Sequence, residues 1–369
     1  MKILVTGAKG FIGKNLIAEL KKEKYENIYE YDVDSSLEEL EKYSQDCEFV
    51  FHLAGVNRPK DESEFLKGNL GFTTTLLELL KKHNNKSPVM ISSSIQAELD
   101  NPYGKSKKAG EDALLEYGKV NGVKVLVYRL PNVFGKWARP NYNSAVATFS
   151  YNIARGLPIT INNPDVMMSL VYIDDVIKEL VKALKGEENR KGNYCYVEPV
   201  HQVKLGYIAE LLYSFKKSRE ERSVPKLDDP FIKKLYSNYL SYLEEDDFGY
   251  DLLMHKDHRG SFTEFLKTTD RGQVAVNISK PGITKGNHWH HTKNEKFLVV
   301  YGRGVIRFRK IGEEKVIEYY VSGEELQVID IPVGYTHNIE NLGETDMVTI
   351  MWVNEIFDPN NPDTIYEEV

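Results

Sequence analysis

Three histidines and one glutamate in the last third of the chain have the spacing of a metal site. His288 and His290 are two residues apart, Glu295 follows shortly after, and His337 lies further along. Side chains two apart in a strand point to one face, so His288 and His290 would share a face, while Glu295 and His337 would return on other strands. Three imidazoles and one carboxylate suit zinc, iron, manganese or nickel and leave a position for substrate or water.

Glycines recur where the first apolar run meets the first predicted helix. The run Thr6–Gly13 contains Gly7, Gly10 and Gly13, and it opens the helix predicted at Phe11–Glu23. Glycines there permit a tight turn and let the backbone approach a pyrophosphate on the helix N-terminus. The run therefore predicts a dinucleotide site. Its predicted contact residues are Gly7, Lys9, Gly10, Phe11, Ile12, Gly13, Asp32, Leu53, Ala54, Tyr103 and Lys107.

Two signals for the identity of the dinucleotide conflict. Asp32 ends the second predicted strand, where an acid can bond the ribose hydroxyls of NAD. Lys9 inside the glycine loop, with Ser35 and Ser36 nearby, could instead receive the additional phosphate of NADP. The sequence leaves both cofactors open, with NADPH expected and NADH as the alternative.

A serine, a tyrosine and a lysine have the pattern of a hydride-transfer site. Tyr103 and Lys107 are four residues apart in a predicted helix and would share a face, and Ser94 ends a predicted strand. A phenol with a pKa near 10 is a poor acid at neutral pH. We expect the Lys107 ammonium, together with the nicotinamide charge, to lower the pKa of Tyr103. Ser94 would then hydrogen-bond the substrate carbonyl.

Composition excludes several classes of protein. The chain has 369 residues and a formal net charge of -7, which argues against nucleic-acid binding through a broad basic surface. Its two cysteines, Cys47 and Cys195, are isolated, which fits a reducing compartment. No apolar run approaches the ~18 residues of a membrane span, and no signal peptide is recognisable. We expect a cytoplasmic enzyme.

The pattern of elements changes near residue 245. Before it, short apolar runs alternate with helical patterns, which predicts βα units around a doubly wound parallel sheet. The predicted strands there are Lys2–Val5, Ile28–Tyr31, Phe49–Leu53, Val89–Ser92 and Lys124–Arg129, and the helical segments are Phe11–Glu23, Gly71–His83, Tyr103–Asn121 and Pro225–Glu245. Beyond it the predicted elements are strands: Phe262–Leu266, Gln273–Ser279, Lys296–Tyr301, Val305–Lys310, Val316–Val321, Leu326–Ile331 and Thr345–Val353. The expected domains are 1–245 and 246–369.

The first part resembles a known family. The string Pro102–Lys107, with Ser94, resembles the catalytic residues of the extended short-chain dehydrogenase/reductase family, the nucleotide-sugar epimerases and dehydratases, over about residues 1–240. The resemblance implies a Rossmann-like fold. Arg129–Gly135 resembles the family's substrate-binding segment, which implies that Asn132 meets the sugar nucleotide.

The segment predicted to contact the nucleotide departs from the family's pattern at one point. Val171–Val176 resembles the segment near the base, yet Met167–Ser169 stands where the family often carries a basic residue. Lys136 and Arg139 are candidate partners for the diphosphate, and solvated loop charges are the alternative for both.

The second part resembles the cupins. Gly282–Gly302 and Pro332–Asn341 are similar to the two-part cupin motif, which implies a small antiparallel β-barrel. Asp257–Glu264 resembles the Asp-x-Arg-Gly-x-Phe-x-Glu string of nucleotide 4-keto-sugar epimerases. That resemblance implies that Arg259 pairs with a diphosphate, with a surface ion pair as the alternative. It also implies a general base at His288, which is thus a candidate both as base and as metal ligand.

Epimerisation beside a ketone also needs an acid on the opposite face of the sugar. We expect a tyrosine in this role. The candidates are Tyr301, Tyr319, Tyr320 and Tyr335, and the sequence does not separate them.

The order of the two parts resembles a group of bifunctional capsular polysaccharide enzymes. The resemblance implies a UDP-linked 2-acetamido-2,6-dideoxy-4-hexulose as substrate. The cupin would epimerise it at C3, and the reductase would reduce C4 with NADPH to the UDP-6-deoxy-talosamine derivative, a precursor of UDP-N-acetyl-L-fucosamine. It further implies zinc and a homodimer. The alternatives are a reductase whose cupin is only structural or dimerising, and a non-enzymatic dinucleotide sensor, which would not need the proton donor Tyr103.

Overall fold

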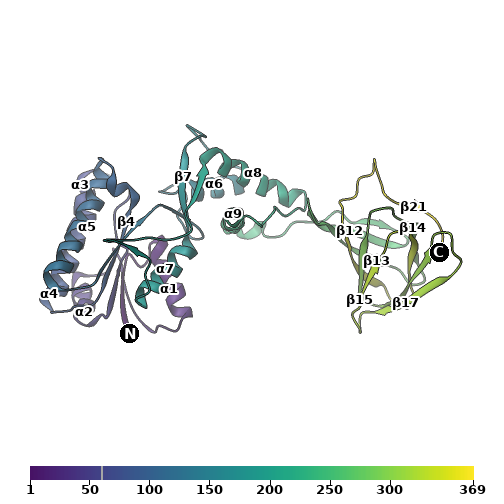
Figure 1. Ribbon diagram of the computed structural model, residues 1–369, viewed down its shortest axis with the longest axis horizontal. Coiled ribbons are helices and arrows are strands. Elements are labelled where there is room, and N and C mark those ends of the chain that lie inside the picture. Colours follow the sequence, from purple (N-terminus) through teal and green to yellow (C-terminus); the bar gives the residue numbers. More distant parts are fainter. Residues whose placement is uncertain (60) are drawn as a thin grey trace. The chain divides into compact units, whose positions relative to one another are not determined.

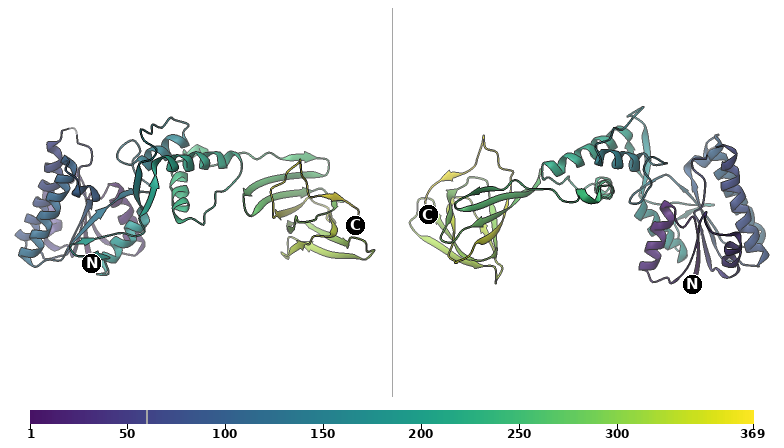
Figure 2. Two further views of the ribbon diagram at one scale, coloured as in Figure 1. Left: turned by 45° about the horizontal axis from the view of Figure 1, so that its top comes forward. Right: turned by 180° about the vertical axis from the view of Figure 1, so that it is seen from behind.

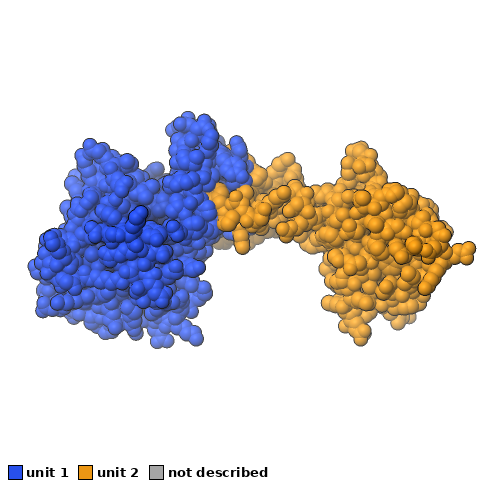
Figure 3. Space-filling view, viewed as in Figure 1, with its two compact units in different colours: residues 1–212, 234–243 blue, residues 213–233, 244–369 orange. Residues whose placement is uncertain are grey.

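The computed structural model describes residues 1–59 and 61–369. The chain divides into two compact units, which Figure 3 colours separately. The first comprises Met1–Leu212 and Lys234–Leu243, and the second comprises Tyr213–Lys233 and Glu244–Val369. The division near residue 244 lies next to the expected boundary at 245, whereas residues 213–233 group with the later unit.

A seven-stranded sheet forms the centre of the first unit (Figure 1). All its neighbouring strands are parallel except the last pair, and the strand order is β2-β1-β3-β4-β5-β9-β8. The bounds are β1 (Lys2–Thr6), β2 (Asn27–Tyr31), β3 (Phe49–His52), β4 (Val89–Ser94), β5 (Val125–Leu130), β8 (Arg190–Lys191) and β9 (Tyr194–Cys195).

Helices cover both faces of this sheet, as the apolar strands require. Ile3 and Val5 belong to a core with α1 (Phe11–Lys22) and α7 (Ile173–Leu184), while Leu4 belongs to a core with the helices of the other face. This alternation follows from the two-residue period of a strand. The helices of the second face are α2 (Leu37–Asp46), α4 (Phe72–Lys82) and α5 (Pro102–Asn121). The predicted doubly wound α/β fold is confirmed.

Smaller elements complete the first unit. A three-stranded sheet has the order β10-β7-β6. The bounds are β6 (Asn132–Phe134), β7 (Met167–Tyr172), β10 (His201–Lys204), α3 (Ser63–Leu66) and α6 (Ala145–Ala154), while α8 (Leu205–Glu220) and α9 (Pro230–Leu240) each contain residues of both units. The helix predicted from Gly71 begins earlier, because α3 and a π-helical turn, η1 (Lys67–Gly71), precede α4. A 3-10 turn, η2 (Ile95–Glu98), follows β4.

The second unit contains two antiparallel sheets (Figure 2). One has the order β11-β12-β13-β20-β15-β18 and the other β17-β16-β19-β14-β21. The bounds are β11 (His255–Asp257), β12 (Gly260–Thr268), β13 (Gly272–Ser279), β14 (Thr284–Trp289), β15 (Glu295–Tyr301), β16 (Arg303–Lys310), β17 (Val316–Ser322), β18 (Val328–Ile331), β19 (Tyr335–Asn341), β20 (Met347–Val353) and β21 (Ile365–Tyr366).

The core of this unit lies between the two sheets. Phe297 and Val299 alternate inward from β15, and Ile306 and Phe308 do so from β16. The predicted cupin-type barrel is confirmed. Across the part of the chain that the structure describes, every helix is too short or too polar to span a bilayer.

Candidate functional site

The glycine loop joins β1 to α1 at the carboxyl edge of the parallel sheet. Gly7 has a φ of +70°, and a methyl group there would lie 2.8 Å from the Ala54 nitrogen. A methyl group on Gly13 would lie 2.2 Å from the Gly7 carbonyl oxygen. Both positions therefore require glycine, and Leu53 and Ala54 wall the loop. Strands β1, β3 and β4 are neighbours, so the segments that follow them meet at this edge.

Replacing Gly13 with alanine is expected to weaken dinucleotide binding at least ~10-fold, because the added methyl forces the loop away from the helix that receives the pyrophosphate. A fluorescence titration with NADPH would measure the loss. Gly249 is a suitable control, since a methyl group there meets no atom within 4 Å. Equal affinity in the wild type and the Gly13 variant would contradict this account of the loop.

Asp32 and Lys9 are joined in a way that the sequence did not reveal. The Lys9 backbone N–H donates to Asp32 Oδ2 over 2.6 Å, and the Lys9 ammonium pairs with Asp34. That ammonium holds the pKa of Asp34 below its usual value. Ser35 accepts a bond from the Asp32 backbone, and Ser36 caps α2. Lys9 thus stands among carboxylates at the place where a ribose substituent would lie.

Tyr103 and Lys107 lie in the first turns of α5, which begins at an asparagine cap. Asn101 Oδ1 accepts from the Gly104 N–H over 2.8 Å, and the Lys107 ammonium lies 5.9 Å from the centre of the Tyr103 ring. Burial lowers the pKa of Lys107 to about 8, with Glu111 opposing the shift. Lys107 also donates to the Ser92 carbonyl over 3.4 Å. The structure therefore brings the predicted pair together beside the end of β4.

In the protein without a dinucleotide the pKa of Tyr103 is raised, whereas the predicted lowering included the charge of a bound nicotinamide. Burial raises the pKa of Tyr103, and a hydrogen bond with Ser94 opposes the shift. Ser94 is the last residue of β4, and its Oγ also accepts from the Gln96 backbone. Ser94, Tyr103 and Lys107 therefore converge, but desolvation has the largest effect on the pKa of the Tyr103 phenol.

Three buried or partly buried side chains around this site were missed from the sequence. The Tyr103 hydroxyl donates to Asn57 Oδ1 over 3.1 Å. Asn69, in η1, bonds both backbone groups of Val56. Glu111 is fully buried and accepts from Ser93 and from the Arg129 guanidinium. The only feature of the sequence that pointed to Glu111 was its position about two helical turns after Tyr103 in the same helix.

The predicted substrate residues lie on and after β6. Asn132 is exposed and donates to the Ser169 carbonyl over 3.2 Å. The Lys136 ammonium pairs with Asp174 at the start of α7. The Arg139 guanidinium lies 5.3 Å from the centre of the Tyr142 ring. Lys136 is therefore already paired with a carboxylate. Asn132 and Arg139 present polar side chains on and after β6.

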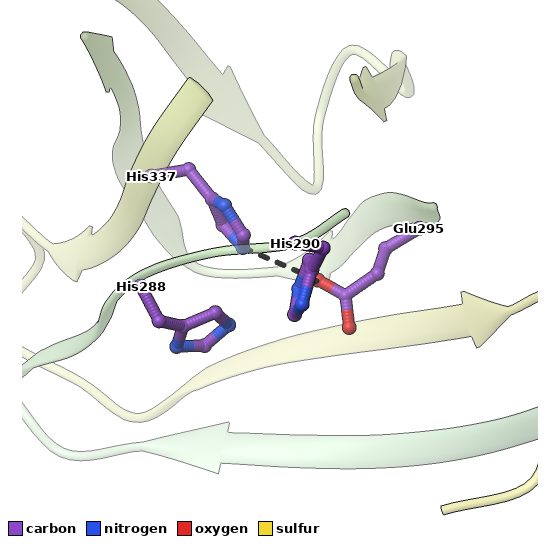
Figure 4. A group of neighbouring side chains, drawn as sticks. All are labelled: His288, His290, Glu295 and His337. Atoms are coloured by element: carbon purple, nitrogen blue, oxygen red, sulfur yellow. Dashed lines mark hydrogen bonds and ion pairs between the residues drawn. The ribbon is translucent and has the colours of Figure 1, made fainter. Parts of the chain in front are cut away.

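The four predicted metal ligands converge in the second unit (Figure 4). One ligand atom from each of His288, His290, Glu295 and His337 lies within 4.8 Å of the others. His337 Nε2 is 3.2 Å from Glu295 Oε2, and His290 Nε2 is 3.6 Å from the same oxygen. Burial raises the pKa of Glu295, but the His290 and His337 rings outweigh it and lower the pKa to about 2.

The strand geometry behind this cluster has one feature that was not predicted, a bulge. β14 ends at Trp289, so His290 lies beyond the strand that carries His288. A bulge at Asn287, whose φ is +60°, interrupts the pairing of β14 with β19 and places His288 opposite His337. The bulge therefore sets His288 against His337, while the His288 and His290 rings lie on the same side, with 4.9 Å between their centres, as predicted.

The donor atoms fit a transition metal. His290 Nδ1 donates to the Asp363 carbonyl, which leaves Nε2 as the free nitrogen. His290 Nε2 is buried without a hydrogen-bond partner among the described residues. The Asp363 carboxylate accepts from the backbones of His291, Thr292 and Lys293, and so holds the loop that carries His290. Asp363 was missed from the sequence, since it lies about seventy positions away.

A cavity of about 610 Å³ opens onto the cluster. His288, Glu295 and His337 line it, and Lys285 and Arg259 line it as well. Lys285 donates to Asn277 Oδ1 and to the Ile278 carbonyl, both over 2.8 Å, and burial lowers its pKa. Arg259 pairs with Asp257 over 2.6 Å. This is the ion pair that was the alternative to a diphosphate contact. Cationic side chains and the imidazoles therefore line the same cavity, together with Asp257.

The predicted tyrosines do not meet this cavity. Its described lining includes none of Tyr301, Tyr319, Tyr320 and Tyr335. Tyr335 packs against the barrel core, and the other three are exposed. The lining offers Lys285 and His255 as proton-bearing groups instead.

Comparisons with known proteins follow the same two parts of the chain. The model of the NAD dependent epimerase/dehydratase family matches residues 3–195, and that of the polysaccharide biosynthesis C-terminal domain matches residues 255–365. A UDP-2-acetamido-2,6-beta-L-arabino-hexul-4-ose reductase from Pseudomonas aeruginosa is 45% identical over 99% of this chain and 98% of its own.

Two solved structures are also similar. The capsular polysaccharide assembling protein CapF from Staphylococcus aureus is 57% identical, with a TM-score of 0.95 over the whole of both chains. A UDP-glucuronic acid 4-epimerase from Bacillus cereus shares the fold, with 24% identity and a TM-score of 0.53 over 59% of this chain and 84% of its own. The chain belongs to the NAD-dependent epimerase/dehydratase family, and within it to the CapF-type capsular polysaccharide proteins that add a cupin-type C-terminal domain.

Proposed function

We propose that the protein is an NADPH-dependent reductase of a UDP-linked 4-keto-6-deoxy sugar. The observation that carries the proposal is the convergence of Ser94, Tyr103 and Lys107 beside the glycine loop. The name of the Pseudomonas aeruginosa relative, a reductase of a UDP-linked hexul-4-ose, supports this substrate class. Proteins with dinucleotide-binding folds have many different activities. The proposal therefore rests on these three side chains and not on the fold.

The site residues divide the work of ketone reduction. The reduced nicotinamide, when bound, supplies the hydride to the carbonyl carbon. Tyr103 donates its hydroxyl proton to the carbonyl oxygen, and Ser94 donates a hydrogen bond to the same oxygen. Lys107 places a buried cation one turn from the phenol, which favours the phenolate that remains.

We propose that Asn132 and Arg139 contact the sugar nucleotide and that Lys136 exchanges Asp174 for a phosphate oxygen. The supporting observations are their positions along and after β6 and the polar groups that they present. A guanidinium suits a diphosphate because it can form two parallel hydrogen bonds.

We propose further that the cupin part epimerises the same sugar at C3 before the reduction. The product would be the UDP-6-deoxy-talosamine derivative. His290, Glu295 and His337 would hold a metal, zinc by the chemistry of the donor set, which when bound would polarise the 4-ketone. His288 lines the cavity, and its imidazole would accept the C3 proton as general base. Its alternative role is that of a fourth ligand.

A second candidate function is a reductase whose cupin is only structural. The Asp363 contacts that hold the 291–293 loop favour a rigid site, but a structural metal would need them equally. The two candidates differ in whether the full chain without cofactor exchanges the C3 proton with solvent. A homodimer, as implied by the capsular resemblance, is also proposed and can be tested by light scattering.

The direct test of the reductase is consumption of cofactor with a defined sugar. The full chain, NADPH and the UDP-linked 4-keto sugar should give one oxidised cofactor for each reduced C4, measured by absorbance and by NMR of the product. Absence of turnover with every nucleotide 4-keto sugar tried would contradict the proposal and favour a dinucleotide-binding sensor.

We expect NADPH to be preferred to NADH, because Lys9 can bond the additional phosphate. Asp34 competes for that ammonium, so Asp34→Asn should raise the preference several-fold. Specificity constants for the two cofactors measure both effects. A wild-type preference for NADH would contradict the prediction and make Asp32 the deciding residue.

A further inference from the structure

We propose that Asn57 is a further catalytic residue of the reductase, whose side-chain amide bonds the Tyr103 hydroxyl oxygen in both protonation states. It accepts from the neutral phenol while no ketone is bound, and it donates to the same oxygen once the single phenol proton goes to the ketone. This inference rests on the proposed reductase function, because only proton transfer to a ketone makes the phenolate a required state.

The contact on which the inference rests involves the reacting oxygen itself. The Tyr103 hydroxyl donates to Asn57 Oδ1 over 3.1 Å. Among the described residues, Lys107 from α5 and Tyr142 from the segment between β6 and α6 are titratable groups that face Tyr103. Ser94 of β4 bonds the hydroxyl, and the Phe65 ring of α3 lies 5.6 Å from the Tyr103 ring.

The backbone next to Asn57 is fixed relative to the catalytic helix. Asn69 Oδ1 accepts from the Val56 N–H over 3.0 Å, and Asn69 Nδ2 donates to the Val56 carbonyl over 3.2 Å. The same Nδ2 donates to Ser106 Oγ, which lies between Tyr103 and Lys107 on α5, over 2.9 Å. Asn69 is buried, and its π-helical turn places it against both segments. These hydrogen bonds of Asn69 therefore hold the Asn57 amide at hydrogen-bond distance from the Tyr103 phenol.

Proton transfer reverses what the phenol oxygen needs from this neighbour. During reduction the Tyr103 O–H bond breaks, its proton forms the new bond to the carbonyl oxygen, and the hydride forms the new C–H bond. The phenolate then has no proton to give and requires donors. An amide carries an acceptor and donors of almost the same shape, so a half-turn of its terminal torsion presents Nδ2 to the anion. Preorganised neutral donors to a developing anion lower the barrier strongly in a desolvated site.

The decisive variant is Asn57→Asp, which keeps the shape and the acceptor but removes the donor. Tyr103 must be protonated for ketone reduction, so kcat/KM falls as pH rises through its pKa. A carboxylate facing the hydroxyl disfavours the phenolate and raises that pKa, so the alkaline limb should move upward by about one pH unit or more. Asn57→Ala should lower kcat about 10- to 100-fold with KM little changed.

Asn27→Asp is the matched control, since it adds the same charge at the opposite, amino end of the sheet, in β2. Melting temperature and cofactor affinity check that each variant folds. An alkaline limb that stays in place in Asn57→Asp overturns the proposal, whatever happens to kcat.

A second readout keeps the inference separate from the identity of the substrate. The phenol of Tyr103 can be titrated by ultraviolet difference spectroscopy, comparing each protein with its Tyr103→Phe counterpart. Asn57→Asp should raise the titration midpoint, with or without any turnover. If the wild type reduces no 4-keto sugar while the midpoint rises, the proposed function fails but the contact stands. An unchanged midpoint overturns the inference alone.

Discussion

Tyr103→Phe is expected to abolish NADPH-dependent reduction while leaving proton exchange in the cupin part intact. The Tyr103 hydroxyl is bonded by Ser94 and Asn57, and Lys107 lies 5.9 Å from the ring centre, so this oxygen is the acid placed for the ketone. Loss of a general acid typically costs about 10²–10⁴-fold in rate. Phenylalanine keeps the ring and its packing, so cofactor binding should persist.

Two measurements follow the two activities of this variant separately. Cofactor oxidation reports the reductase, and deuterium entering C3 of the sugar without cofactor reports the cupin. Tyr207→Phe, at an exposed position of α8, is the control for loss of a tyrosine hydroxyl. Reduction at the wild-type rate in Tyr103→Phe would remove Tyr103 from its assigned role. Loss of C3 exchange would show that the two parts do not work independently.

Removal of the metal, or His337→Ala, is expected to destabilise the barrel and to impair C3 exchange. Without a metal, three imidazoles and one carboxylate are crowded together, two of the imidazoles buried, with His290 Nε2 lacking a hydrogen-bond partner among the described residues. Metal at a hundred times its Kd stabilises the folded state by about 2.7 kcal/mol. For a domain of this size that corresponds to a melting temperature lower by on the order of 10 °C after removal.

His337→Ala and chelation of the wild type are two independent tests of the metal site. His291→Ala is the matched control, because His291 is exposed and holds Asp363 through its backbone N–H. Calorimetry should show the lower transition for His337→Ala and for chelated wild type, but not for His291→Ala. NADPH affinity should be unchanged in all three. Metal-free protein that melts and exchanges like the wild type would contradict the assignment of the cluster.

The sequence predicted those features that local chemistry determines. The glycine loop could be recognised because φ near +70° at Gly7 and close backbone approach at Gly13 both require glycine. Tyr103 and Lys107 could be paired because a helix puts residues four apart on one face. The metal set was found because its residue types are chemically distinctive, but the bulge at Asn287 that sets His288 opposite His337 was not visible in the pattern.

Features that depend on distant pairings could not be predicted. Asn57 meets Tyr103 from 46 positions away, and Asp363 reaches His291 from 72 positions away. Neither residue type is unusual in a loop, so no local pattern marks it. The raised pKa of Tyr103 also escaped prediction, because burial is a property of the folded unit. The tyrosines proposed for the cupin failed for the same reason, since their exposure follows from the barrel.

The measurement that tests the two-step account most directly is isotope incorporation by the full chain in deuterated water. The UDP-linked 4-keto sugar is incubated first without cofactor and then with NADPH, and the sugar is followed by NMR. The account predicts deuterium at C3 before any cofactor is added, followed by reduction at C4 once NADPH is present. Reduction at C4 with no deuterium at C3 under either condition would contradict it and leave a reductase whose cupin is only structural.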